Sequence, residues 1–143
     1  MKKIIVVGST GRLGRVVVSG LEDYEVIRAG RSGPDLKIDA LDFESVSDVF
    51  ASVGSFDGLV SCIGGTPFKT FEELTMEDFA TGLSKKCFSQ LNLAKAAIPF
   101  LTENGSITLT SGIIGDEPIL AGSCAAAANG ALNMCVSTLA AEY

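Results

Sequence analysis

The 143-residue chain contains no histidine and no tryptophan, and only two of its residues are tyrosine. The absence of histidine excludes Ser-His-Asp and Cys-His catalysis, and it excludes metal ligation by imidazole. Four cysteines are present without a C-x-x-C pair, so neither a zinc ribbon nor a thioredoxin-type redox site is indicated. Free thiols are typical of a reducing compartment. We therefore expect a cytoplasmic protein without a metal site.

Positive charge is also scarce. Lysine and arginine number 11 against 17 acidic residues, which gives a net charge of −6. This balance argues against non-specific binding to nucleic acid or to an anionic membrane, because both need a basic surface. It leaves room for one anionic cofactor held by a few arginines. A secretory signal is not expected, since the apolar run after Lys2 and Lys3 ends at Gly8.

Residues 118–141 carry no charge at all, and a stretch of this length can span a bilayer. It nevertheless contains glycine, asparagine, serine and threonine, and it is rich in alanine rather than leucine. This composition favours a helix packed on all sides within the protein over a transmembrane helix.

Strand and helix patterns alternate along the chain. Strands are predicted at residues 3–7, 25–29, 36–38, 58–62 and 106–110, and helices at 11–21, 44–53, 75–101 and 122–142. The third helix opens with a capping-box pattern, Thr75 and Asp78, and Glu103-Asn104-Gly105 breaks it. Nearly continuous apolar strands separated by helices predict a doubly wound α/β fold, with a parallel sheet covered on both faces. Right-handed crossovers give the strand order 3-2-1-4-5 in one domain over residues 1–143.

A glycine-rich turn follows the first predicted strand. It reads Gly8-Ser9-Thr10-Gly11-Arg12-Leu13-Gly14 and opens the first predicted helix. Such glycines let the backbone approach a pyrophosphate, whose charge then lies at a helix N-terminus. The spacing is G-x-x-G-x-x-G rather than G-x-G-x-x-G, and a turn that binds nothing is the alternative. The strand–helix–strand context favours a dinucleotide site.

The end of the second predicted strand indicates which nucleotide is bound. An NAD site usually has a carboxylate there for the ribose hydroxyls, whereas this chain has Arg31 and Ser32. A guanidinium group suits a 2′-phosphate, and Arg12 can reach the same region, so we expect NADP(H). The alternative for both arginines is a solvated surface position. Asp39 can accept a hydrogen bond from the adenine amino group, or it can form a turn or helix cap.

These pieces resemble the short-chain dehydrogenase/reductase family over essentially the whole chain. The resemblance rests on the glycine turn, Ala29-Gly30-Arg31-Ser32, Ile38-Asp39, Leu59-Val60-Ser61-Cys62-Ile63-Gly64-Gly65, and the segment from Gly105 to Gly112. It implies a Rossmann-type fold and a nicotinamide cofactor, with Cys62, Ile63 and Gly64 in the cofactor loop that reads Asn-Asn-Ala-Gly in the family. The last helix is similar to the family's dimer-forming helix, which implies a homodimer or homotetramer.

The chain departs from the family in its catalytic residues. The family's chemistry uses a serine, a tyrosine and a lysine, and often an asparagine as well. The tyrosine protonates the substrate carbonyl, and the lysine lowers the pKa of the tyrosine. Ser111 stands at the serine position, although a plain turn residue is the alternative there. Other residues replace the rest: Ala125 for tyrosine, Asn129 for lysine, and Ser84 near the asparagine.

Substitutes for the missing acid are few. Tyr24 is expected in the first helix and Tyr143 at the end of the chain, and neither is expected to reach the site. Lys85 and Lys86 can supply an acid, but charged residues are rarely buried, so we expect both on a solvated helix face. The chain also stops where the family continues into a sixth strand. We therefore expect the C-terminal strands to be absent, with a fragment or an incomplete nicotinamide pocket as the two explanations.

Two functions fit this pattern. The first is an NADP(H)-dependent oxidoreductase that transfers hydride to or from a small carbonyl or alcohol substrate, with Ser111 in the catalytic site. The alternative is a non-catalytic NADP(H)-binding sensor or regulatory module, which the missing tyrosine and lysine favour. A scaffold that binds no nucleotide is disfavoured by the glycine turn and Arg31.

Overall fold

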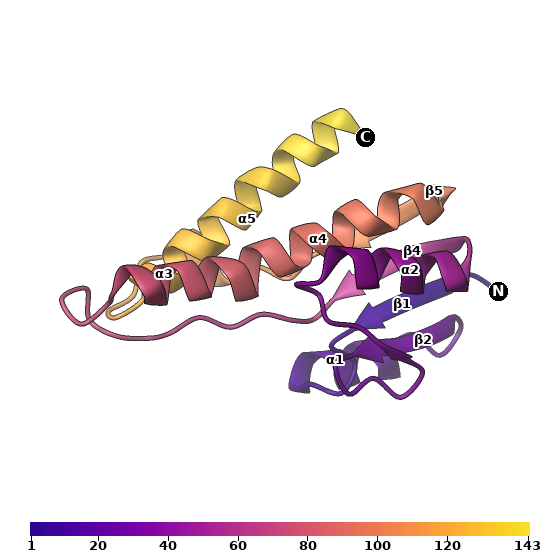
Figure 1. Ribbon diagram of the computed structural model, residues 1–143, viewed down its shortest axis with the longest axis horizontal. Coiled ribbons are helices and arrows are strands. Elements are labelled where there is room, and N and C mark those ends of the chain that lie inside the picture. The colour runs from indigo at the N-terminus through magenta and orange to yellow at the C-terminus, as the bar shows by residue number, and fades with distance from the viewer. The chain divides into compact units, whose positions relative to one another are not determined.

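The computed structural model describes residues 1–143 (Figure 1). These residues form two compact units. Unit 1 comprises Met1–Ile63 and Asn92–Leu109, and unit 2 comprises Gly64–Leu91 and Thr110–Tyr143. One domain over residues 1–143 stays a prediction.

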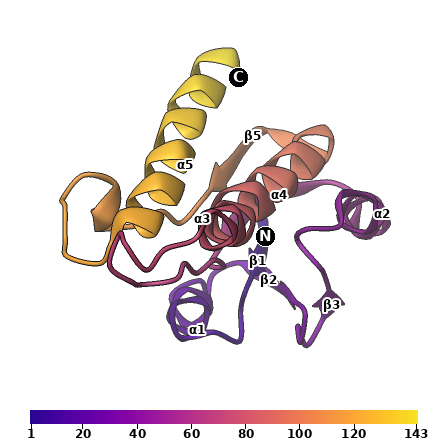
Figure 2. The same cartoon turned by 60° about the vertical axis from the view of Figure 1, so that its left-hand side comes forward.

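Unit 1 is built on a five-stranded parallel sheet of order β3-β2-β1-β4-β5, which confirms the predicted order. The strands are β1 (Lys3–Val7), β2 (Glu25–Gly30), β3 (Leu36–Lys37), β4 (Phe56–Ser61) and β5 (Leu101–Thr108). Helices α1 (Arg12–Ser19) and α2 (Phe43–Val53) lie on opposite faces of this sheet (Figure 2). Helix α1 ends before Tyr24, so this tyrosine lies in the connection to β2 and not in the helix as predicted.

The core of unit 1 lies between the sheet and α2. Alternate residues of β1 point to this side, because successive side chains of a strand face opposite ways. Here Ile5 and Val7 pack with Phe50 of α2 and Phe56 of β4, whose rings meet edge to face at 5.4 Å between centroids. Leu93 and its neighbours at the end of α4 (Ser89–Ala97) complete the cluster. Alternate residues of the nearly continuous apolar strands therefore join α2 in one packed layer.

The predicted helix over residues 75–101 is divided and ends early. It consists of α3 (Met76–Gly82), the π-helical turn η1 (Leu83–Phe88), α4 and the 3₁₀ turn η2 (Ile98–Phe100). Pro99 cannot donate a helical hydrogen bond, and β5 begins at Leu101. The residues expected to break the helix lie instead in an irregularity of β5, where pairing with β4 jumps from Leu101 to Ser106.

Unit 2 consists of α3, η1, the short turn η3 (Ile113–Gly115) and α5 (Ser123–Glu142). The prediction that the last helix is packed on all sides is wrong for its second half, where Met134 and Val136 are exposed. Helix α5 packs mainly against α3, η1 and η3, each of seven residues or fewer. These short elements cover only part of a helix of 20 residues. By length and composition α5 is a helix that can cross a membrane, with 28% of its most apolar window buried. The buried residues of α5 lie in its first half: Cys124, Ala125, Ala128, Asn129 and Leu132.

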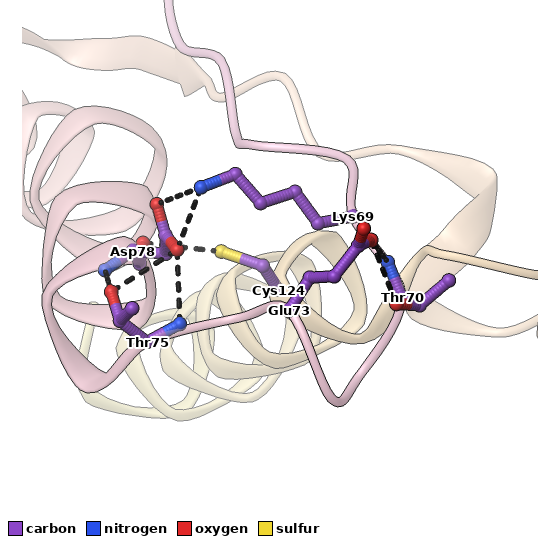
Figure 3. Close-up of polar contacts among 6 residues, drawn as sticks. All are labelled: Lys69, Thr70, Glu73, Thr75, Asp78 and Cys124. Atoms are coloured by element: carbon purple, nitrogen blue, oxygen red, sulfur yellow. Dashed lines mark hydrogen bonds and ion pairs between the residues drawn. The ribbon is translucent and has the colours of Figure 1, made fainter.

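The start of α3 is anchored by Asp78 (Figure 3). The predicted capping box is confirmed, because Asp78 Oδ2 accepts a hydrogen bond from the Thr75 backbone N–H at 2.9 Å while Thr75 Oγ1 accepts one from the Asp78 N–H. Lys69 Nζ lies 3.0 Å from the same carboxylate. The bond from Thr75, and then that from Lys69, hold the pKa of Asp78 below its ordinary value. Cys124 Sγ donates to the Asp78 carbonyl at 3.4 Å and so links α5 to α3.

Candidate functional site

The turn between β1 and α1 requires glycine at two positions. Gly8 has a φ of +81°, and its N–H donates to the Ala29 carbonyl at 2.9 Å. A Cβ on Gly8 would lie 2.7 Å from the carbonyl oxygen of Cys62. A Cβ on Gly14 would overlap the carbonyl of Gly8. Both glycines therefore permit close packing of backbone on backbone, which is what a phosphate-binding turn needs.

The N-terminus of α1 has no side-chain cap. Its N-cap residue is Gly11, no side chain accepts from the first turn, and that turn contains no acidic residue. The first N–H groups and the positive end of the helix dipole are therefore available to an anion. Thr10, Arg12 and Leu13 are exposed around them. Ser9 differs, because its side chain is buried and its Oγ donates to the Ala29 carbonyl at 3.3 Å.

The loop after β2 presents an arginine that has no partner. Arg28 binds Asp35 through two contacts of 2.9 Å, from Nε and Nη2, and the Arg28 backbone N–H adds a third at 2.8 Å. The side-chain hydrogen bonds from Arg28 are the main cause that lowers the pKa of Asp35. Asp35 is the only carboxylate between β2 and β3. Arg31 is exposed and makes no ion pair, and Arg12 likewise makes none. Ser32 is exposed beside Arg31.

Three further predicted residues of unit 1 lie after β3 and β4. Asp39 Oδ1 accepts from the Leu41 N–H at 3.1 Å, which is the turn role, and this leaves its second oxygen for a ligand. Cys62 and Ile63 follow β4, and the Cys62 N–H donates to the Val7 carbonyl at 2.8 Å. Burial raises the pKa of the Cys62 thiol. The structure thus groups the predicted residues of unit 1 at the carboxyl ends of β1, β2, β3 and β4.

Unit 2 contains Ser111 in contact with a lysine. Lys86 Nζ donates to the Ser111 backbone carbonyl at 3.2 Å, and Ser111 Oγ donates to the Asn129 carbonyl at 3.4 Å. Lys85 is exposed as expected, but the prediction of a solvated position is wrong for Lys86, which is half-buried. Burial lowers the pKa of its ammonium group. Both lysines belong to the π-helical turn, whose face assignments cannot be read from a 3.6-residue period.

Gln90 is a site residue that sequence analysis missed. Its side chain is fully buried. Nε2 donates to the carbonyls of Lys86 and Thr110 at 2.8 Å each, and Oε1 accepts from the Thr110 N–H at 2.9 Å. One amide thus links the turn that carries Lys86 to the residue before Ser111. A polar glutamine within an apolar helical stripe was the available signal.

Ala125 and Asn129, which the sequence predicts at the positions of the family's tyrosine and lysine, are both buried. Ala125 is 2% exposed and Asn129 is 4% exposed, one helical turn apart on α5. Asn129 Oδ1 has no hydrogen-bond partner. Neither residue supplies a phenol or an ammonium group. Ser84, predicted near the family's asparagine, is half-buried. The hydrogen bond to Ser111 comes from Lys86. Gly64 lies against the Lys86 side chain.

Comparisons with known proteins agree with this architecture. Residues 24–143 match the model of the enoyl-(acyl carrier protein) reductase family. Senescence-associated protein 13 of Arabidopsis thaliana is 33% identical over 102 residues, which are 70% of this chain and 37% of that protein. The structure of protein lin1944 from Listeria innocua is 40% identical with a TM-score of 0.93, and the match covers 99% of this chain and 72% of that one. A small-chain dehydrogenase solved in complex with NADPH is 25% identical with a TM-score of 0.86, over 99% of this chain and 64% of that one. The chain therefore belongs to the short-chain dehydrogenase/reductase family of oxidoreductases.

Proposed function

We propose that this protein is an NADP(H)-dependent oxidoreductase that transfers hydride to or from a small carbonyl or alcohol substrate. The observation that carries the proposal is the unpaired Arg31 after β2, in a loop whose only carboxylate is held by Arg28. A free guanidinium is the group that recognises a 2′-phosphate, whereas an NAD site uses a free carboxylate. The NADPH bound by one relative of known structure supports the same preference.

The residues of unit 1 fit such a nucleotide. Glycines at positions 8 and 14 let the turn pack closely against its own backbone and against Cys62, and the uncapped first turn of α1 suits a pyrophosphate. The bound nicotinamide supplies the hydride chemistry. The chain itself binds the two phosphate groups, orients the nucleotide through the turn, and selects the 2′-phosphate through Arg31 and Arg12.

A second candidate function is a non-catalytic NADP(H) sensor or regulatory module. Ala125 and Asn129 favour it, because neither can give a proton as the family's tyrosine does. In either case we propose a cytoplasmic protein that assembles as a homodimer or homotetramer.

Nucleotide binding and turnover separate these candidates. NADPH and NADH are titrated against the full-length protein by the nucleotide's own fluorescence, with little protein background because tryptophan is absent. NADPH consumption is then followed with a panel of aldehydes and ketones. Tight NADPH binding with turnover supports the oxidoreductase. Binding without turnover, together with a nucleotide-dependent change of assembly, supports the sensor. No binding of either nucleotide refutes both.

A further inference from the structure

We propose that Lys86 is the proton donor of this oxidoreductase, in the role that tyrosine has in its relatives. The inference rests on the proposed function and adds a residue to it. It follows from the hydrogen bond that the Lys86 ammonium group donates to the backbone carbonyl of Ser111, the residue predicted at the position of the family's catalytic serine.

The Lys86 side chain is held in one direction. Its stem lies against Gly64, where an added Cβ would come within 2.5 Å of the Lys86 Cδ. Its Nζ donates one hydrogen to the Ser111 carbonyl at 3.2 Å. An ammonium group carries three hydrogens and accepts none, so two remain for a substrate. Gly64 therefore has a packing role in unit 2, because a larger residue there would displace the lysine.

Charge at this position is not neutralised by a carboxylate. The ion pairs of the structure are Arg28–Asp35 and Lys69–Asp78, and Lys86 belongs to neither. Asp78 is engaged with Lys69 and with the N-terminus of α3. Burial without a counter-ion favours the neutral amine and lowers the pKa of Lys86. A lysine with a lowered pKa releases its proton more readily than a solvated one, which suits a general acid.

Gln90 and Ser111 complete the arrangement. The buried Gln90 amide holds both the Lys86 carbonyl and the Thr110 backbone, so the lysine-bearing turn and the serine-bearing segment keep a fixed spacing. The Ser111 hydroxyl makes only a long contact of 3.4 Å to the Asn129 carbonyl. This weak bond is easily exchanged for one to a substrate oxygen. Unit 2 therefore offers two donors from one neighbourhood, Ser111 Oγ–H and Lys86 Nζ–H.

In the reductive direction, Lys86 gives a proton from Nζ to the carbonyl oxygen of the substrate. The N–H bond would break and an O–H bond would form, and a bound reduced nicotinamide nucleotide would supply the hydride for the carbonyl carbon. The carbonyl would become an alcohol at the expense of the reduced nucleotide, and the lysine would be left as a neutral amine. A proton from the solvent would then restore the ammonium group, so that the net reduction consumes one solvent proton. Ser111 donates a hydrogen bond to the oxygen throughout and keeps its own proton.

The test compares three variants of the full-length protein. Lys86→Met removes the proton, Lys86→Arg keeps the positive charge but holds its proton at a far higher pKa, and Lys85→Met is the matched control on the exposed neighbour. We measure NADPH affinity, turnover with the most active carbonyl substrate, and the lysine pKa values by NMR of ¹³C-labelled lysine. The Lys86 signal is the one absent from the Lys86→Arg spectrum.

We expect both Lys86 variants to bind NADPH like the wild type and to lose turnover by about 10²–10⁴-fold, the usual contribution of a general acid. Lys85→Met is expected to behave as the wild type, and the Lys86 signal is expected to titrate below the ordinary lysine pKa. Turnover retained in Lys86→Arg, or an ordinary titration of Lys86, overturns the inference and leaves NADP(H) dependence intact. Failure of the wild type to bind NADPH overturns the proposed function, and the role of Lys86 falls with it.

Discussion

Replacing Arg31 by alanine tests the nucleotide preference most directly. In the structure this guanidinium is exposed and makes no ion pair, so its removal breaks no interaction within the protein. We therefore expect the fold and the thermal stability to be unchanged. Any loss of affinity can then be assigned to the ligand.

The magnitude follows from the exposure of the side chain. A hydrogen bond to a charged group contributes about 1.5–3 kcal/mol, and exposure to solvent places Arg31 at the lower end. At about 1.4 kcal/mol for each factor of ten, the Kd for NADPH should rise by about 10- to 30-fold. NADH has no 2′-phosphate, so its affinity should not change. Added salt should weaken NADPH binding to the wild type more than to the variant, because exposed charges are screened.

Fluorescence titration of both nucleotides measures these affinities, and Arg15→Ala is the control. Arg15 is also an exposed arginine without an ion pair, but it lies further along α1 than Arg12. We expect its removal to leave the preference for NADPH unchanged. An equal loss of NADPH and NADH affinity in Arg31→Ala, or no loss of either, would refute the assignment of a 2′-phosphate site.

Three other predictions concern the turn, the core and the start of α3. Gly14→Ala should abolish NADPH binding and lower the Tm, because the added Cβ would overlap the backbone carbonyl of Gly8. The control Gly20→Ala should be tolerated, because the nearest atom to its added Cβ is 3.6 Å away. Equal Tm values for the two variants would contradict this prediction. Phe50→Ala should cost about 3–5 kcal/mol in guanidinium unfolding, since the ring is fully buried, and a loss below about 1 kcal/mol would show that this core is not tightly packed. The pKa of Asp78 is lowered in the folded state, so its stabilising effect is present above the unfolded value of about 3.9 and disappears as the pH falls through the folded value. The difference in free energy of unfolding between the wild type and Asp78→Asn should therefore be larger at pH 7 than in acid. Urea unfolding at both pH values measures this difference, and an equal difference at the two pH values would contradict the prediction.

Local features of the chain could be predicted because they depend on neighbours in the sequence. The capping box needs only Thr75 and Asp78 three residues apart, and the turn after β1 needs glycines at set positions. Strand order followed from apolar strands joined by helices and from the handedness of crossovers. Helix ends were less accurate, because η1 and Pro99 interrupt an apolar stripe that a helical period reads as continuous.

The site separates in the same way. The sequence by itself determined the fold and the glycine-rich turn, and it predicted Ala125 and Asn129 at the positions of the family's tyrosine and lysine, since each depends on residue type at a position. Only the tertiary structure decided that Asp35 is taken by Arg28 while Arg31 stays unpaired. It also decided that Lys86, and not Lys85, lies at Ser111, with Gln90 holding the two segments. The physical reason is that burial and hydrogen bonding between segments far apart in the chain depend on tertiary packing. Lys85 and Lys86 have the same side chain, so only packing distinguishes them.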